Sequence, residues 1–317
     1  MTKTHKLQFS VLAAVSLVLI LLYLLGHMIG AWDYVFPRRM YKVAAMVLTG
    51  GAIAISTVVF QTLTNNRILT PSIIGLDSVY MLFQTFIFYI FGSTSPLVTK
   101  DHYNFLLAVL LMMLFVAMLY KLMFQREGRH LLHLLLVGLV FGTFFGSMTT
   151  FMQVLIDPNE FLSLQGKMFA SFNNVNTDLL PYALGILVLT GVFGVRYVKY
   201  LDVLSLGREH AVNLGLDYNR LVKQLLVLVA VLVALSTALV GPVTFLGLLT
   251  ANLAYQLMGS YRHQLLLPSA FLISVVTLVG GQLLVERVFS FTTTLSVIVN
   301  FAGGLYFMYL LLRESKL

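Results

Sequence analysis

Long apolar runs, broken by short polar segments, dominate the order of hydrophobic and polar positions along this chain. The runs lie near residues 7–29, 40–63, 72–92, 105–122, 131–155, 179–198, 222–241, 265–285 and 293–312, with a shorter one near 243–258. A helix of about 20 apolar residues spans the hydrocarbon core of a bilayer. Because backbone groups cannot stay unpaired in lipid, each run is expected to be a helix. The pattern predicts an all-α, polytopic integral membrane protein of about ten transmembrane helices.

The polar segments between the runs are short. The longest lie near residues 93–104, 156–178 and 199–221, and none can hold a folded catalytic domain. The first run is longer than the apolar core of a signal peptide and lacks a clear cleavage site, so we expect it to remain as a helix. Residues 1–317 are therefore predicted to form a single transmembrane domain.

Composition narrows the class of protein. Of the 317 residues, 59% are apolar and 10% are charged, whereas a soluble globular domain has about 45–50% apolar and roughly 25% charged residues. This difference in composition excludes a soluble enzyme, a disordered chain and a nucleic-acid-binding protein. The helices are therefore expected to be surrounded by membrane lipid. Because the chain has no cysteine, it has no disulfide, thiolate nucleophile or cysteine metal site.

The basic residues predict an orientation in the membrane. The net charge of +8 comes from 20 Lys and Arg against 12 Asp and Glu, and cytoplasmic loops carry an excess of Lys and Arg. If the N-terminus is inside and the runs alternate, fourteen basic residues fall in inner segments and six in outer ones, namely Arg38, Arg39, Lys42, Lys100, Lys167 and Arg287. Both termini are therefore predicted to be cytoplasmic.

Three of the outer cations lie close together, in the segment Phe36-Pro37-Arg38-Arg39-Met40-Tyr41-Lys42. Pro37 suits the start of a helix, since no N–H donor is needed there. Two interpretations remain open: the basic side chains reach lipid phosphates, or they form a docking surface for an acidic partner, whose carboxylates the planar fork of Arg can bind. Two interpretations are also open for Arg287: it neutralises Glu286, which precedes it, or, because adjacent residues rarely face each other on a helix, it pairs with a different group.

Two other segments have regular patterns. The polar turn from Gln61 to Gly75, which contains Pro71, is interpreted as a well-capped helical hairpin. Further along, small residues recur at every fourth position on one helix face, where they permit close helix approach in lipid; these are Gly138, Gly142, Gly146 and Thr150. Packing within the bundle and packing along a subunit interface or a narrow pathway both remain open for this face.

The inner loop 204–220 is long enough for one or two short helices. Its pattern is too regular for a flexible linker, so we interpret it as an interaction element rather than only a charged connection. Ala211 and Gly215, four residues apart, are expected to leave room for a partner surface. The candidate docking residues of this loop are Gly207, Glu209, Ala211, Leu214 and Gly215.

The chain offers no set of residues for catalysis or for binding a nucleotide. The spacing around Gly166 is not that of a phosphate-binding loop, and no HExxH motif occurs. His130 and His133 have no acidic ligand between them, so no metal site is predicted. Asp77 is the main acid within a predicted helix, whereas ion-coupled carriers usually have several buried acids.

A bundle with an outer cationic patch, an inner docking loop and no visible energy source fits a permease powered by a separate ATPase. A stand-alone secondary carrier or channel for a small solute is the alternative. A membrane enzyme is a further rival, but no convergent acid–base set supports it.

These features, in this order, resemble the permease subunits of iron–siderophore, haem and cobalamin ABC importers over about residues 36–310. Phe36-Pro37-Arg38 stands where that family has Leu-Pro-Arg, the stretch from Gln61 to Gly75 stands where it has Gln…Asn-Pro-Leu-Ala-x-Pro…Gly, and Gly241–Leu248 matches Gly-x-Ile-x-Phe-Val-Gly-Leu. The loop 206–215 matches Leu-Gly-Glu-x2-Ala-x2-Leu-Gly with one extra residue. The stretch 292–297, together with Arg38-Arg39 and Ile68–Pro71, resembles the branch that handles ferric catecholate siderophores of the petrobactin and vibriobactin kind.

The resemblance implies the fold of a type II ABC importer permease, in a bacterial cytoplasmic membrane. It implies a second permease subunit, with a heterodimer favoured, two cytoplasmic ATPases that hold ATP and magnesium, and an extracytoplasmic siderophore-binding protein. It also implies that Arg38 contacts the binding protein, with Arg287 as a second contact and Arg39 as a further docking candidate. Residues 206–216 match the segment that contacts the ATPase. No cofactor is expected on this chain.

Overall fold

The computed structural model describes residues 3–26, 32–124, 131–173 and 175–314. Arg126, Arg129 and Lys316, which contributed to the predicted orientation, lie outside these ranges, as does His130. Within them the chain is helical and contains no strand, which confirms the predicted all-α class. The long helices are α1 (Lys3–Leu25), α2 (Trp32–Thr64), α3 (Leu76–Phe91), α5 (Asp101–Phe124), α6 (Leu131–Leu155), α8 (Leu180–Val195), α11 (Tyr218–Val240), α12 (Leu246–Met258), α13 (His263–Arg287) and α14 (Leu295–Glu314).

Short helices occupy the connections. They are η1 (Pro71–Ile74), α4 (Pro96–Thr99), α7 (Pro158–Met168), η2 (Thr177–Leu179), α9 (Val198–Leu204) and α10 (Arg208–Asn213). In the described part of the chain, eight helices are long and apolar enough to cross a membrane. Two of the predicted runs correspond to shorter helices, α3 with 16 residues and α12 with 13, so the predicted count of about ten is approximate.

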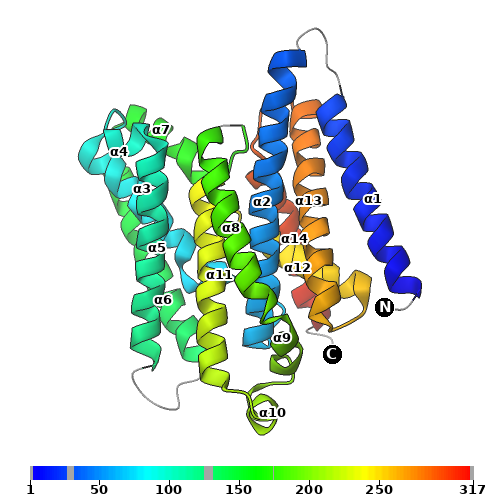
Figure 1. Cartoon of the computed structure of the whole chain (residues 1–317). Helices are drawn as coiled ribbons and strands as arrows, with labels where there is room; N and C mark the ends of the chain where they lie inside the picture. The colour runs from blue at the N-terminus through cyan, green and yellow to red at the C-terminus, as the bar shows by residue number, and fades with distance from the viewer. Residues whose placement is uncertain (1–2, 27–31, 125–130, 174, 315–317) are drawn as a thin grey trace.

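Helix α2 lies at the centre of the bundle, where it packs most extensively against α11 and α13, while α1 lies at the periphery (Figure 1). Small residues allow this packing: Gly50 lies against Leu278, and Gly51 lies against the ring of Phe271. In lipid, helices associate through close packing of this kind, because apolar side chains gain little by leaving an apolar solvent.

Two ends of the bundle can be distinguished (Figure 1). We call the end where α2 begins and α13 ends the Arg38 face, and the opposite end, which contains α9 and α10, the α10 face. Helix α1 begins, and α14 ends, toward the α10 face. This common side for both ends of the chain agrees with an even number of crossings.

The start of α2 differs from the prediction. The sequence predicted a helix start at Pro37, but the helix begins at Trp32 and Pro37 lies inside it. Pro37 is the sixth residue of this helix, past the first four N–H groups that have no helical partner, so it removes one helical hydrogen bond from the added turn. The rings of Trp32 and Phe36 lie 6.2 Å apart in a stacked arrangement across this added turn.

The turn between α2 and α3 is compact, as the predicted hairpin required, and its main chain is held by buried side chains. The main-chain oxygen of Arg67 accepts hydrogen bonds from Gln61 Nε2 at 2.6 Å and from Asn252 Nδ2 at 2.9 Å. Gly75 then begins α3 with a φ of +92°, a conformation that favours glycine. Irregular backbone within a membrane protein is stable where protein groups satisfy it in this way.

Candidate functional site: the two ends of the bundle

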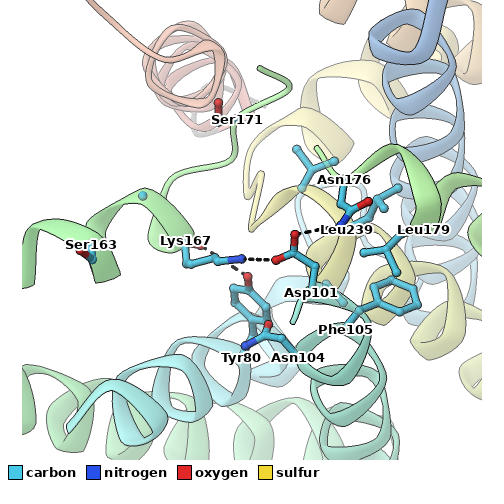
Figure 2. Close-up of a pocket in the computed structure, with 13 residues that line it drawn as sticks. Tyr80, Asp101, Asn104, Phe105, Ser163, Lys167, Ser171, Asn176, Leu179 and Leu239 are labelled. Atoms are coloured by element: carbon cyan, nitrogen blue, oxygen red, sulfur yellow. Dashed lines mark hydrogen bonds and ion pairs between the residues drawn. The ribbon is translucent and has the colours of Figure 1, made fainter. Parts of the chain in front are cut away.

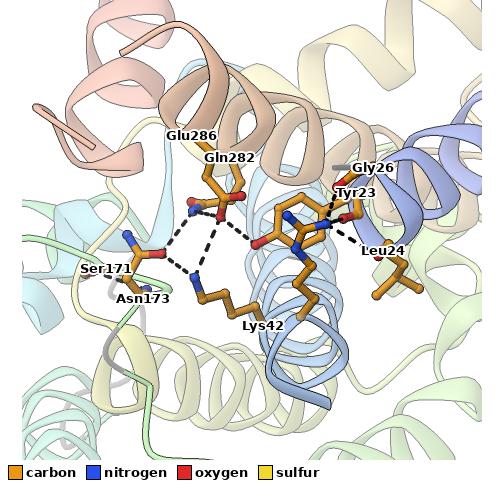
Figure 3. A network of polar contacts seen from close by, with 9 residues as sticks. Tyr23, Leu24, Gly26, Lys42, Ser171, Asn173, Gln282 and Glu286 are labelled. Carbon is orange, nitrogen blue, oxygen red and sulfur yellow. Dashed lines mark hydrogen bonds and ion pairs between the residues drawn. The ribbon is translucent and has the colours of Figure 1, made fainter. Parts of the chain in front are cut away.

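A branched network of polar side chains joins α1, α2, α13 and the segment 169–173 at the Arg38 face (Figure 3). At its centre, Glu286 Oε1 accepts hydrogen bonds from Tyr23 OH at 2.7 Å and from Gln282 Nε2 at 3.0 Å. Lys42 Nζ lies 3.7 Å from the same oxygen. Asn173 Oδ1 accepts from Lys42 Nζ at 2.8 Å and from Gln282 Nε2 at 3.1 Å. The largely buried carboxylate of Glu286 is therefore paired, as burial of a charge requires.

The two adjacent arginines of α2 have different surroundings. Arg39 Nη1 donates to the main-chain oxygens of Tyr23 at 2.9 Å and of Gly26 at 2.5 Å. These oxygens lie at the end of α1, where carbonyl groups lack helical partners and a cation complements the helix dipole. The side chain of Arg38 is exposed, and its guanidinium carbon lies 4.2 Å from the centre of the Tyr34 ring. Arg39 thus holds α1 against α2, while Arg38 presents its charge outside the bundle.

The carboxylate of Glu286 pairs with Lys42 of α2, which is far from it in the sequence. The guanidinium of Arg287 lies beside Gly26, and this side chain has an interaction partner within the chain. Close to these residues, an open cavity of about 670 Å³ has cations and aromatic rings in its wall, among them Arg38, Lys42, Tyr34, Tyr41, Phe172 and Phe291.

Helix α7 belongs to the same face and is held near both of its ends. Glu160 Oε2 accepts a hydrogen bond from the main-chain N–H of Ser93 at 2.6 Å. Lys167 Nζ lies 2.9 Å from Asp101 Oδ1, whose other oxygen accepts from Asn176 Nδ2 at 3.0 Å (Figure 2). Asp101, Lys167 and Asn176 line a polar cavity of about 230 Å³. Because Lys167 is paired with Asp101, it contributes less unpaired positive charge to this face than Arg38 does.

The loop at the α10 face presents apolar side chains to its surroundings. Leu214 is 64% exposed, and Leu206 and Val212 are also exposed. Gly207 and Gly215 have φ angles of +96° and +83°, which turn the chain into and out of α10, and Glu209 lies exposed in the first turn of this helix. We call Leu206, Val212 and Leu214, which lie before, within and after α10, the ridge. Exposed apolar side chains of this kind suit contact with another protein.

Ala211 faces the opposite way from the expected contact. Its side chain is 0% exposed and packs in the same core as Leu201 and Leu204 of α9. From the sequence, Ala211 and Gly215 were expected to leave room for a partner. Space is open at Gly215, where an added Cβ would meet nothing within 4 Å. Ala211 instead packs α10 against the bundle.

The glycine face of α6 divides into two parts. Gly138 and Gly142 pack within the chain: a Cβ at Gly138 would lie 2.8 Å from Ile74 Cα, and one at Gly142 would lie 3.3 Å from Gly75 Cα. An added Cβ at Gly146 would meet nothing within 4 Å, and Thr150 is exposed. The first part therefore serves packing within the bundle, and the second part is open to a pathway or a neighbouring subunit.

Several residues of these two ends were not singled out from the sequence. Tyr23 is separated from Glu286 by 263 positions, and no spacing rule joins residues so far apart. Val212 could have been found from its apolar character, close to the candidate Leu214 in the same loop. Over the ranges that the structure describes, no group of three or more His, Cys, Asp or Glu side chains is placed to hold a metal ion.

The fold and the two ends define a class: a polytopic membrane protein with exposed cations at one end and exposed apolar side chains at the other. Sequence comparison gives the family. The model of the FecCD transport family matches residues 7–313, and the chain belongs to this family. It is a transport component and not an enzyme.

Relatives and a solved structure agree with this assignment. The petrobactin import system permease protein YclO of Bacillus subtilis is 58% identical over 98% of this chain and 99% of its own length. The petrobactin import system permease protein FatC of Bacillus anthracis is 36% identical over 89% of this chain and 80% of its own length. The structure of a metal-chelate type ABC transporter in an inward-facing conformation superposes with a TM-score of 0.84 over 97% of this chain and 99% of that one, at 21% identity. That last likeness shows the shared fold.

Proposed function

We propose that this chain is one permease subunit of an ABC importer that carries a ferric siderophore of the petrobactin type across a bacterial cytoplasmic membrane. The observation that carries this proposal is the presence of two different exposed surfaces, one cationic and one apolar, at opposite ends of one bundle. The 58% identity to a petrobactin import permease supports the cargo. The exposed ridge at the α10 face supports a partner that supplies the energy.

The proposed orientation places the Arg38 face outside and the α10 face in the cytoplasm, with both termini cytoplasmic. In this orientation Arg38 meets an acidic group of a siderophore-binding protein. Its guanidinium is exposed and its plane is supported by the ring of Tyr34, so it is held ready for a carboxylate. Arg39 and Arg287 contribute positive charge to this surface while they hold the ends of α1 and α13 in place.

At the α10 face, Leu206, Val212 and Leu214 seat in a groove of a cytoplasmic ATPase, which binds ATP and magnesium. The buried Ala211 and the two turns at Gly207 and Gly215 fix the direction of this ridge. Two ATPases and a second, different permease complete the importer, and the open half of the α6 face, at Gly146 and Thr150, lies toward the second permease or the pathway.

The proposed cycle is conformational. The loaded binding protein docks at the Arg38 face, ATP closes the ATPases, and the ridge transmits their movement to the bundle. Each ligand shifts the balance between outward-open and inward-open states only by its difference in affinity for them. The pathway needs no tight site for the chelate, because a tightly held cargo would be released slowly.

Reconstitution tests the proposal against a stand-alone carrier. Proteoliposomes that contain this chain, its partner permease and the ATPase should accumulate radio-iron-labelled ferric petrobactin when ATP and the loaded binding protein are supplied. Proteoliposomes with this chain alone should accumulate none. Uphill accumulation by the chain alone would support a secondary carrier and overturn the proposal.

A further inference from the structure

A linear chain of hydrogen bonds lies at the α10 face, between the docking loop and the centre of the bundle. Asp202 belongs to α9, His263 is the first residue of α13, and Thr62 lies in the last turn of α2. His263 Nδ1 lies 2.7 Å from Asp202 Oδ1, and His263 Nε2 lies 2.6 Å from Thr62 Oγ1. Three segments that are far apart in sequence are thus joined through one imidazole ring.

The donors and acceptors of this chain can be assigned. An ionised carboxylate only accepts, so Asp202 Oδ1 accepts from His263 Nδ1 and also from the main-chain N–H of His263 at 2.8 Å. Thr62 has one hydroxyl hydrogen, and its oxygen lies 2.8 Å from the main-chain oxygen of Val58 as well as close to the imidazole. A neutral His263 accepts that hydrogen, whereas a protonated His263 donates to the oxygen and leaves the hydrogen for Val58. The chain is complete in both states.

The position of this chain of bonds connects it to the docking ridge. The His263 side chain is 1% exposed, and Asp202 is more accessible, beside a cavity of about 560 Å³ whose wall includes Arg67, Leu206 and Tyr261. Asp202 is four residues from Leu206, and its main-chain oxygen accepts from Ser205 Oγ at 2.7 Å. Leu206, the first residue of the ridge, therefore lies about one helical turn after Asp202, the residue that is hydrogen-bonded to α13.

Packing alone would not fix these elements as firmly. Leu201 and Leu204 bury apolar area between α9 and the bundle, but apolar contact has no direction and allows sliding. A hydrogen bond to a buried imidazole is directional, and breaking it leaves an unsatisfied polar group in a medium of low dielectric. Moving α9 is consequently expected to move the inner ends of α13 and α2 with it.

We propose that Asp202, His263 and Thr62 form the mechanical link that passes ATPase movement from the docking loop to helices α13 and α2. The three are positioning residues, and the inference rests on the proposed function, because it takes the α10 face as the ATPase contact. The link is in series, since the two hydrogen bonds of Asp202 join α9 to α13 and the bond of Thr62 joins α13 to α2. Loss of either connection should therefore interrupt it to the same extent.

The test uses the complete importer with variants that break one bond at a time. Thr62→Val keeps the shape of the side chain and removes the bond to His263. His263→Asn keeps an amide near the position of Nδ1, and so keeps the contact with Asp202 but not with Thr62. His263→Gln places its amide near the position of Nε2, so it keeps the contact with Thr62 and removes the Nδ1 bond to Asp202, while the main-chain N–H of residue 263 still reaches Asp202. Asp202→Ala removes both bonds to α13. We expect each variant to insert and assemble normally but to lower the amount of ferric petrobactin imported per ATP hydrolysed by about tenfold.

A double variant separates a link from ordinary stabilising contacts. For a link in series, Asp202→Ala with Thr62→Val should lower uptake per ATP no further than the worse single variant. Two independent contacts would instead give the product of the single effects. Thr49→Val is the matched control, because Thr49 is equally buried in α2 and its hydroxyl bonds only to its own helix, at the oxygen of Ala45; it should leave uptake per ATP unchanged.

A second measurement does not depend on the cargo. Because the chain has no cysteine, single cysteines can carry spin labels at Lys199 in α9 and Gln264 in α13. In the unaltered complex this distance should stay the same when ATP binds, and in Asp202→Ala it should change or broaden. A distance that behaves alike in both proteins, or normal uptake per ATP in Thr62→Val and His263→Gln, would overturn the link. Failure of the unaltered complex to import ferric petrobactin would instead overturn the proposed cargo, and the label distances would still decide the link.

Discussion

Polar contacts hold α2 and α13 in place at both ends of this helix pair, but the contacts are arranged differently at the two ends. At the Arg38 face the network is branched. Glu286 contacts Tyr23, Gln282 and Lys42, and Asn173 also accepts hydrogen bonds from Lys42 and Gln282. At the α10 face the contacts form a single line through His263. A branched network holds its shape when one outer member is lost, whereas a single line fails at any member. One end therefore keeps its contacts when a single outer residue is replaced, whereas the other end depends on every residue of its line.

The largest expected effect is at the centre of the branched network. Glu286→Leu removes the acceptor for Tyr23 OH and leaves Lys42 without its carboxylate. Breaking a buried ion pair costs 3–5 kcal/mol, and because Lys42 is partly exposed we expect about 3 kcal/mol of lost stability. Thermal unfolding of the detergent-purified protein measures this loss. Gln282→Leu, at the edge of the network, should cost about 1 kcal/mol; equal losses in the two variants would contradict a branched design.

The next effect separates the two arginines of α2. Arg39→Met removes the donor to the carbonyls at the end of α1, and should cost about 2 kcal/mol of stability without changing the affinity for the binding protein beyond the loss of one charge. Arg38→Met should change stability by less than about 0.5 kcal/mol. Arg38→Glu should weaken binding-protein docking, and because exposed charges are screened over about 8 Å at physiological ionic strength, the weakening should shrink as salt is added.

Thermal unfolding and binding measured in parallel on these arginine variants give the decisive pattern. If Arg38→Glu left docking unchanged at every salt concentration, Arg38 would have no part in the contact. If Arg39→Met left the unfolding temperature unchanged, the carbonyl contacts at the end of α1 would contribute nothing to holding that helix.

A smaller effect is expected at the ridge of the α10 face. Leu214→Asp places a charge where an apolar side chain should be buried on the ATPase, and we expect about tenfold weaker co-purification of the ATPase, equivalent to about 1.4 kcal/mol. Asn213→Asp adds a charge to the same loop without removing an apolar contact, and it serves as the control. A similar loss in both variants would indicate that charge, rather than apolar contact, governs this surface.

The smallest effect concerns the ring beneath Arg38. Tyr34→Leu removes the aromatic face that lies 4.2 Å from the guanidinium carbon. At an exposed site this contact contributes about 0.5–1 kcal/mol, so binding-protein affinity should fall by about two- to fivefold. Tyr34→Phe, which keeps the ring, should restore it; no difference between Leu and Phe would show that the ring does not hold Arg38 in place.

Much of the fold could be predicted from the sequence because bilayer thickness fixes the length of an apolar run. Runs such as 222–241 and 265–285 correspond to α11 and α13 within a few residues. The start of α2 was missed because Trp32–Phe36 is polar and aromatic rather than apolar, so hydropathy gives no sign of the added turn. The loop 204–220 was predicted to contain short helices, and it contains α10 and the end of α9.

The candidate sites were harder to predict, because their contacts join distant parts of the chain. Arg38 and Arg39 look alike in sequence, and their different surroundings arise from the approach of α1, which no local pattern encodes. The orientation of Ala211 depends on how a helix of six residues sits on α9. The roles of Asp202 and Thr62 depend on partners 61 and 201 positions away, so composition and spacing could not reveal them.

The short helix α3 has a consequence for how the protein is made. Its 16 residues extend for about 24 Å, less than the hydrocarbon thickness of about 30 Å. The turn before it is held against Gly138 and Gly142 of α6, a helix that leaves the ribosome only after α4 and α5. The contacts that hold this turn can therefore form only after α6 has been synthesised, so the packing of the α3 crossing is completed late in biosynthesis.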